Sequence, residues 1–281
     1  MKKIGWLLDA NIDDEKKALI LWIKHEGKTK GYTYRGFTPS IFVSTDLLRE
    51  KDRRMEDIIG SILEHPKVTD AKVVYRFVSV YDDEKSPVLQ VFTSPEAQQE
   101  VARDLEKLPG AIVFHADIDA VQQFFMASDM FAFGRVEFEA KDNETINVRC
   151  IDDREDPEYD LPELEEIDFE VFVDTDQIFP TMEDAIHHIE IYHRGKTIRI
   201  EEDEEEKTLH QFQRVIDEID PDIIVSRGGD ESLFRYLSLR AKSNGMNLVL
   251  SRDGTPLRVM QGKPQSFWQY NRIIPVFPRS M

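Results

Sequence analysis

The stretch Phe169-Glu170-Val171-Phe172-Val173-Asp174 decides the fold of the second half of this 281-residue chain. Its aromatic and β-branched residues predict a short strand that ends in an acidic residue. Beyond it the sequence predicts a tight hairpin, a helix, a buried strand and a second helix, over residues 189–200, 206–219, 223–226 and 231–242. A strand, a hairpin, a helix, a strand and a helix in this order indicate an α/β domain.

The first half of the chain predicts a separate, small α+β domain. Strands are expected over residues 18–23, 28–34, 39–43, 73–81 and 88–92, and helices over residues 46–63, 94–108 and 119–130. Residues 151–168 are acidic, contain proline and lack apolar periodicity, which is typical of a linker. We therefore expect a first domain over residues 1–135, an acidic linker and start of the second domain over 136–168, and the second domain over 169–281.

Composition narrows the class of protein. The chain is 41% apolar, which suffices for two ordinary domains. We expect no membrane span, because no apolar stretch approaches the roughly 18–20 residues that a span needs. Cys150 is the single cysteine, which excludes an internal disulfide framework and a cysteine-rich zinc site and favours the cytoplasm.

The net charge of −19 argues against direct nucleic-acid binding by the surface as a whole. Acidic residues concentrate over residues 152–176 and in the run Glu201-Glu202-Asp203-Glu204-Glu205-Glu206. Such runs are usually solvated loops or faces. If the chain meets DNA, we expect local basic groups or another domain to make the contact.

Several phrases occur in the order typical of one enzyme family. They are Leu8-Asp9, Phe37-Thr38-Pro39, His115-Ala116-Asp117-Ile118, Val173-Asp174-Thr175-Asp176-Gln177, residues 220–230, Ser251-Arg252-Asp253-Gly254 and Ser266-Phe267-Trp268-Gln269-Tyr270. By these phrases the chain resembles the archaeal branch of family B DNA polymerases. The resemblance implies an N-terminal domain followed by a ribonuclease-H-like 3′–5′ exonuclease domain with a mixed sheet.

The resemblance also implies a metal site in the second domain. Asp174 and Asp176 fall where the family has its first exonuclease motif, F-D-I-E-T. Family members hold two divalent metals with clustered carboxylates, so Asp174 and Asp176 would bind Mg²⁺ or Mn²⁺ here, though weakly. Residues two apart on a strand face the same side, which allows the two carboxylates to converge.

The second motif of the family departs from its pattern. N-G-D-N-F-D aligns with Gly228-Gly229-Asp230-Glu231-Ser232-Leu233, so Leu233 replaces the metal-binding acid and Asp230 matches the inner Asp. The third motif would lie beyond Met281, and the polymerase motifs D-x-x-S-L-Y-P, K-x-x-x-N-S-x-Y-G and Y-G-D-T-D are absent from the chain. We expect an inactive proofreading nuclease and no polymerase active site, in a fragment or split-gene product of a longer polymerase.

Two further groups of residues are weaker candidates. Some family members read template uracil in an N-terminal pocket; Pro39 remains here, but Ser40 replaces the aromatic residue that follows it. His187, His188 and His193 could bind a metal, although adjacent histidines more often face solvent.

Three functions remain open. The leading hypothesis is the front end of a polymerase in DNA replication or repair, kept as a scaffold and template-handling surface. Its partners would be DNA, through the full-length polymerase, and the remaining polymerase domains or a subunit. The alternatives are an active metal-dependent 3′–5′ exonuclease that uses Asp174, Asp176 and Asp230, and a non-enzymatic module whose acidic run at residues 201–206 binds a basic partner.

Overall fold

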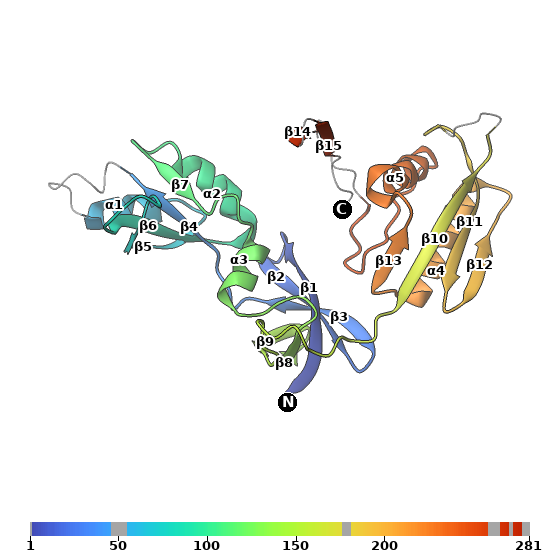
Figure 1. Ribbon diagram of the computed structural model, residues 1–281, viewed down its shortest axis with the longest axis horizontal. Coiled ribbons are helices and arrows are strands. Elements are labelled where there is room, and N and C mark those ends of the chain that lie inside the picture. The colour runs from blue at the N-terminus through green and yellow to red at the C-terminus, as the bar shows by residue number, and fades with distance from the viewer. Residues whose placement is uncertain (1, 46–54, 176–180, 258–264, 270–271, 277–281) are drawn as a thin grey trace. The chain divides into compact units, whose positions relative to one another are not determined.

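The computed structural model describes residues 2–45, 55–175, 181–257, 265–269 and 272–276. The chain divides into two compact units, Met1–Pro162 and Glu163–Met281. Each unit has its own sheets and its own buried cores, as the ribbon in Figure 1 shows. The mixed α/β class expected from the sequence is confirmed.

The first unit contains a closed five-stranded barrel. Its strands are β1 (Lys3–Asp13), β2 (Ala18–His25), β3 (Lys28–Tyr34), β8 (Arg135–Lys141) and β9 (Glu144–Cys150), in the order β1-β2-β3-β9-β8. Glu26-Gly27 and Asp142-Asn143 join two of the hairpins with positive φ at both residues, which the twist of a two-residue hairpin requires. Phe124 of helix α3 (Ala120–Ala127) is fully buried among the apolar side chains of the barrel.

These barrel strands correct the expected domain boundary. Residues 136–150, which the sequence assigned to the linker, form β8 and β9 and close the barrel. Val136 and Phe138 are buried inside the barrel and alternate with acidic residues. Those acidic residues led to the segment being assigned to the acidic linker, although it is a regular strand. The second unit begins at Glu163, because its first strand starts at Glu166 and not at residue 169.

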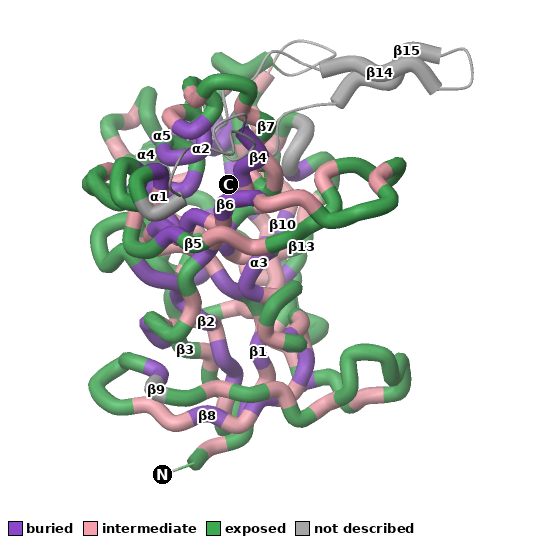
Figure 2. Tube along the Cα trace, turned by 90° about the vertical axis from the view of Figure 1, so that its left-hand side faces the viewer, coloured by how far each residue is buried: buried purple, intermediate pink, exposed green. Residues whose placement is uncertain are grey.

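The first unit also contains an open four-stranded sheet in the order β5-β6-β4-β7. Its elements follow a β-α-β-β-α-β sequence: β4 (Ser40–Ser44), α1 (Met55–Leu63), β5 (Val68–Arg76), β6 (Ser86–Thr93), the 3₁₀ turn η2 (Pro95–Ala97), α2 (Gln98–Leu105) and β7 (Ile112–Phe114). Apolar side chains of both helices and of the central strands form one core. In Figure 2 buried segments follow the strands and helices, whereas the connecting loops are exposed.

The second unit is a mixed sheet covered by helices. Its sheet has the order β12-β11-β10-β13, made of β10 (Glu166–Val173), β11 (Ile186–His193), β12 (Lys196–Ile200) and β13 (Ile223–Ser226). Strands β10 and β13 run parallel, and the other pairs are antiparallel. Helices α4 (Glu205–Ile219) and α5 (Phe234–Ser243) share one core with the inward-facing side chains of the sheet. A separate hairpin pairs β14 (Gln265–Gln269) with β15 (Arg272–Val276).

Two details differ from the expected second unit. Strand β13 was expected to be buried, yet Val225 is exposed, because it points to the sheet face opposite that of its neighbour Ile224, which packs against the core. The helix expected from residue 231 is a π-helical turn, η3 (Gly229–Leu233), followed by α5. None of the described helices is long and apolar enough to cross a membrane.

Candidate functional site

The candidate nuclease residues lie at one edge of the sheet in the second unit. Strands β10 and β13 are parallel, so their carboxyl ends point toward the same edge (Figure 1). Asp174 follows β10, and the segment that carries Asp230 and Leu233 follows β13. In open α/β sheets, ligands bind outside the carboxyl ends of the parallel strands.

Asp174 is exposed at the end of β10. Its backbone N–H donates to the carbonyl oxygen of Ala185 at 3.0 Å, which extends the pairing of β10 with β11 by one residue. The carboxylate is therefore held on ordered backbone and faces solvent. Asp176, the second acid of this motif, lies outside the described residues, so whether the two carboxylates converge stays a prediction.

Leu233 does not occupy a polar site. Its side chain is partly buried and packs against the apolar core of the second unit. An alkyl side chain offers no atom that can bind a metal ion, so this position contributes packing instead of coordination. The backbone of Asp230 lies in η3, and its side chain is outside the described structure.

The turn before η3 depends on two glycines. Gly228 has φ +68°, which glycine adopts without strain. At Gly229 a Cβ atom would lie 2.5 Å from Ser226 Oγ and 2.8 Å from the ring of Phe234. The sequence reading of a strand-to-helix turn is confirmed, and close packing explains the second glycine.

A buried ion pair holds the segment that pairs with Asp174. Arg240 on α5 binds Glu205 at the start of α4 in a bidentate arrangement, with Nε–Oε1 at 2.8 Å and Nη2–Oε2 at 2.5 Å. Glu205 also accepts from the backbone N–H of Ile186 at 2.9 Å and from Asn244 Nδ2 at 2.7 Å. The side chains of Arg240 and Glu205 are only 15% and 10% exposed, so the pair is largely shielded from water.

The same helix fixes the loop before β11. Arg240 donates to the carbonyl oxygen of Glu183 at 2.8 Å, and the Tyr236 hydroxyl donates to that of Asp184 at 2.7 Å. Burial raises the pKa of Tyr236 well above its ordinary value, so this hydroxyl remains a donor. The backbone N–H of Thr181 lowers the pKa of Asp184 by donating to its carboxylate. Sequence reasoning missed these positioning residues, because Glu205 looked like one more acid in a solvated run.

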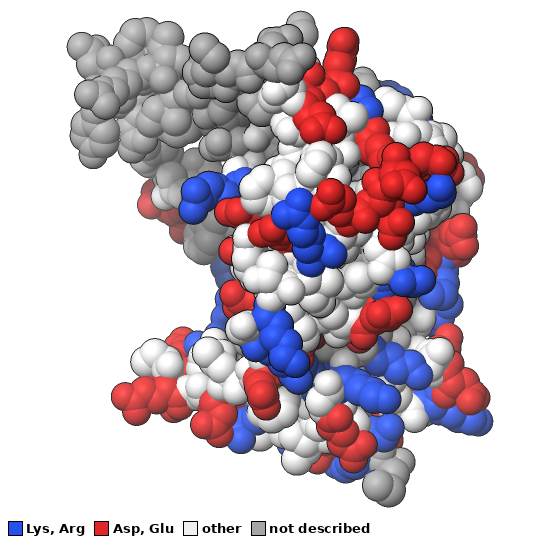
Figure 3. All heavy atoms as spheres, turned by 90° about the vertical axis from the view of Figure 1, so that its right-hand side faces the viewer, with Lys and Arg blue, Asp and Glu red and all other residues white. Residues whose placement is uncertain are grey.

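The acidic run is therefore not a uniform face. Glu201, Glu202, Asp203, Glu204 and Glu206 are exposed, whereas Glu205 belongs to the ion pair with Arg240. Figure 3 shows acidic side chains gathered in the upper part of the face it presents, on the side where Figure 1 draws β12. Two of the exposed members already pair within the chain, Glu201 with Arg199 and Glu204 with Lys207, so binding of a basic partner by this run stays a prediction.

Pro39 is buried in the first unit. Its carbonyl oxygen accepts from the backbone N–H of Thr93 at 3.2 Å, and the N–H of Ser40 donates to Gln123 Oε1 at 3.0 Å. Gln123 in turn donates to the carbonyl oxygen of Ile118 at 3.1 Å. Pro39 thus lies in packed, hydrogen-bonded structure, and its role in a template pocket stays a prediction.

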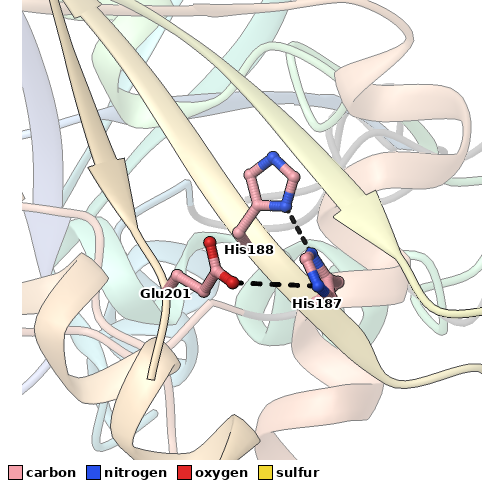
Figure 4. Close-up of side chains that lie close together, drawn as sticks. All are labelled: His187, His188 and Glu201. Carbon is pink, nitrogen blue, oxygen red and sulfur yellow. Dashed lines mark hydrogen bonds and ion pairs between the residues drawn. The ribbon is translucent and has the colours of Figure 1, made fainter. Parts of the chain in front are cut away.

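The three candidate histidines separate into two groups. His193 contacts Glu165, which also binds Arg194. His187 and His188 instead lie beside Glu201, as Figure 4 shows, a residue that sequence reasoning did not group with them. Burial of His188, together with the nearby charges of Arg199 and His187, lowers the pKa of its imidazole.

No family model matches the chain. It is 35% identical over 57 residues to a DNA polymerase of Thermococcus kodakarensis, a match that covers 20% of this chain and 3% of that protein. It is 33% identical over 57 residues to a DNA polymerase of Desulfurococcus sp. (strain Tok), again over 20% of this chain and 7% of that protein. The chain thus matches only a small part of these curated relatives.

The structural similarity is more extensive. The family B DNA polymerase from the hyperthermophilic archaeon Pyrobaculum calidifontis superposes with a TM-score of 0.74 and 19% sequence identity, over 92% of this chain and 35% of that one. The fold is therefore common to both across nearly all of this chain. As the order of its motifs indicated, the chain resembles an archaeal family B DNA polymerase and has the fold of about a third of one.

Proposed function

We propose that this chain is the N-terminal and exonuclease-like part of an archaeal-type family B DNA polymerase, with a second unit that is ribonuclease-H-like and inactive in proofreading. The fold shared over 92% of the chain carries the first part of the proposal. DNA, reached through the full-length polymerase, and the remaining polymerase domains or a subunit are its proposed partners.

The packing of Leu233 is the observation that supports an inactive proofreading nuclease. Phosphodiester hydrolysis by two metals needs clustered carboxylates on both sides of the pair of ions. At the two motif positions with described side chains, Asp174 offers a carboxylate and Leu233 offers an alkyl group that packs into the core. This donor set does not fit a two-metal site, so Mg²⁺ or Mn²⁺ held through Asp174 and Asp176 would bind weakly and without nuclease chemistry.

A degradation assay tests this proposal. The purified chain is incubated with 5′-labelled single-stranded DNA and either Mg²⁺ or Mn²⁺, beside an Asp174→Ala variant. We expect no metal-dependent digestion above that of the variant. Rapid digestion that disappears in Asp174→Ala would overturn the inactive assignment while leaving the polymerase relationship intact.

An active nuclease with altered ligands is the second candidate. The parallel pairing of β10 with β13 favours it, because Asp174 and Asp230 follow strands whose carboxyl ends share one edge. Crystals soaked in Mn²⁺ would then show two ions about 3.5–4 Å apart at this edge. A single ion, or none, would exclude the two-metal mechanism.

A further inference from the structure

Three potential metal ligands converge on the second unit, close in the sheet to the Asp174 motif, since Val173 of that motif pairs with Ile186. They are His187 and His188 on β11 and Glu201, which follows β12. One ligand atom from each lies within 4.8 Å of the other two (Figure 4). The Nδ1 atoms of the two imidazoles are 2.6 Å apart, and His187 Nε2 is 3.8 Å from a Glu201 carboxylate oxygen.

A β-bulge explains why two adjacent histidines lie together. Neighbouring residues on a regular strand point to opposite faces. Here Phe172 pairs with His188 and Val173 pairs with Ile186, so His187 is an extra residue without a partner in the β10–β11 register. Ile186 and Ile189 consequently both face the core although they are three residues apart, and the two histidines between them turn away from it.

The third ligand comes from the neighbouring strand. Ile189 pairs with Ile200, so Glu201 follows directly after the last pair of the β11–β12 ladder, on the same side of the sheet as His188. His188 is nearly buried and stacks on Phe172 with ring centroids 4.3 Å apart, which fixes its position. The side chains of His187 and Glu201 are 41% and 46% exposed, so both can rotate toward an ion and leave a position open to water.

The carboxylates around these ligands favour a cation at this place, once the ion has replaced Arg199 as the partner of Glu201. Glu190 lies 3.6 Å from His188 Nε2. Arg199 is the neighbouring cation: it binds Glu201 at 2.7 Å, lies 3.5 Å from Glu190 and has Nη2 3.5 Å from His188 Nδ1. Arg199 is about half exposed, so an incoming ion can take over Glu201 while the guanidinium moves into solvent.

We propose that His187, His188 and Glu201 form a binding site for one divalent transition-metal ion, with Zn²⁺ as the representative, and that water completes the coordination. Two imidazole nitrogens and one carboxylate suit Zn²⁺, Cu²⁺, Ni²⁺ or Co²⁺, whereas Mg²⁺ prefers oxygen ligands. Ligands about 2.0–2.2 Å from a tetrahedral ion lie about 3.3–3.5 Å from one another. The imidazole nitrogens, now 2.6 Å apart, would therefore separate slightly, which the exposed side chain of His187 permits. The ion would join β11 to the end of β12 and would not depend on the proposed polymerase function.

Calorimetric titration of the full chain with ZnCl₂ tests the site. We expect one tightly bound ion per chain, no displacement by millimolar Mg²⁺, and at least about tenfold weaker binding in His187→Ala and in Glu201→Gln, since even the loss of a group that only orients a ligand weakens metal sites by about 10–100-fold. His188 is left unchanged because its ring supports the packing of Phe172.

Matched variants separate the site from general adsorption to an acidic protein. His210→Ala removes an exposed histidine on α4 that lies beside Glu206, and it should bind Zn²⁺ as the unmodified chain does. Arg199→Gln should bind it more tightly, because the competing cation is gone. Equal affinities for His187→Ala and His210→Ala, or no saturable binding at all, would overturn the proposal.

Discussion

Glu205 illustrates how one side chain organises the second unit. It begins α4, accepts a hydrogen bond from the first residue of β11 and binds Arg240 on α5. A change at this residue therefore acts on three elements together. The two acids on either side of it, Glu204 and Glu206, instead pair with Lys207 and His210 of the same helix.

We expect Glu205→Gln to lower the free energy of unfolding by about 3 kcal/mol at pH 7, because it leaves the largely buried Arg240 without its counter-charge. Urea denaturation measures the loss. Glu206→Gln, which changes the exposed neighbour, is the control and should stay within about 0.5 kcal/mol of the unmodified chain. Equal effects of the two substitutions would contradict the role of the ion pair.

The same substitution has a predictable dependence on pH. Burial alone would raise the pKa of Glu205, but hydrogen bonds from Arg240, Ile186 and Asn244 outweigh it and lower the pKa below its ordinary 4.5. The folded state therefore binds the proton less readily than the unfolded state, and the stabilisation is present above pH 4.5 and lost as the pH falls below it. The stability difference between Glu205→Gln and the unmodified chain should shrink between pH 5 and pH 3; a constant difference would contradict this.

At the scale of elements, two glycines with different surroundings give opposite expectations. Gly229→Ala, a change within η3, places a Cβ against Ser226 and Phe234. It should lower the free energy of unfolding by about 1–3 kcal/mol. Gly60→Ala adds a Cβ to helix α1 with nothing within 4 Å and should stabilise it by up to about 1 kcal/mol. Thermal unfolding measures both, and a destabilising Gly60→Ala would show that α1 is constrained in some other way.

The elements also show what sequence patterns can and cannot predict. Helix α4 begins within one residue of its predicted start, and Arg194-Gly195 forms the predicted turn with φ of +49° and +73°, because both depend on local residues. The barrel was missed because its closure needs β9 to pair with β3, a contact between distant segments. The bulge at His187 was missed too, although the spacing of Ile186 and Ile189 interrupts strict alternation and could have indicated it.

The candidate site was predictable only in part. The sequence located Asp174 at the end of a strand, where the structure has it, and placed Leu233 within a helix over residues 231–242, whereas the structure has it at the end of the π-helical turn η3. It did not predict that Leu233 packs into the core, or that Glu201 meets His187 and His188, since both depend on tertiary packing. Asp176 and the side chain of Asp230 lie outside the described structure, so their part in the site stays a prediction.

At the scale of the whole molecule, the two units have separate cores and should unfold separately. Leu21 is fully buried in the barrel and Leu237 is fully buried in the second unit. Changing either leucine to alanine should lower the free energy of unfolding of its own unit by about 2–5 kcal/mol. Scanning calorimetry of the full chain should show two unfolding transitions. Each substitution should lower the midpoint temperature of one transition and leave that of the other unchanged. A single transition shifted by both variants would show that the units unfold together.

The sheet order has a consequence for self-association. A closed barrel has no free edge, whereas the described sheet of the second unit ends in β12 and β13, whose outer N–H and C=O groups could pair with another chain. Both strands are short, and β12 carries Lys196 and Arg199, charges that oppose the stacking of identical strands. Replacing these two cations with apolar residues would therefore be expected to promote fibrillar aggregation through the β12 edge.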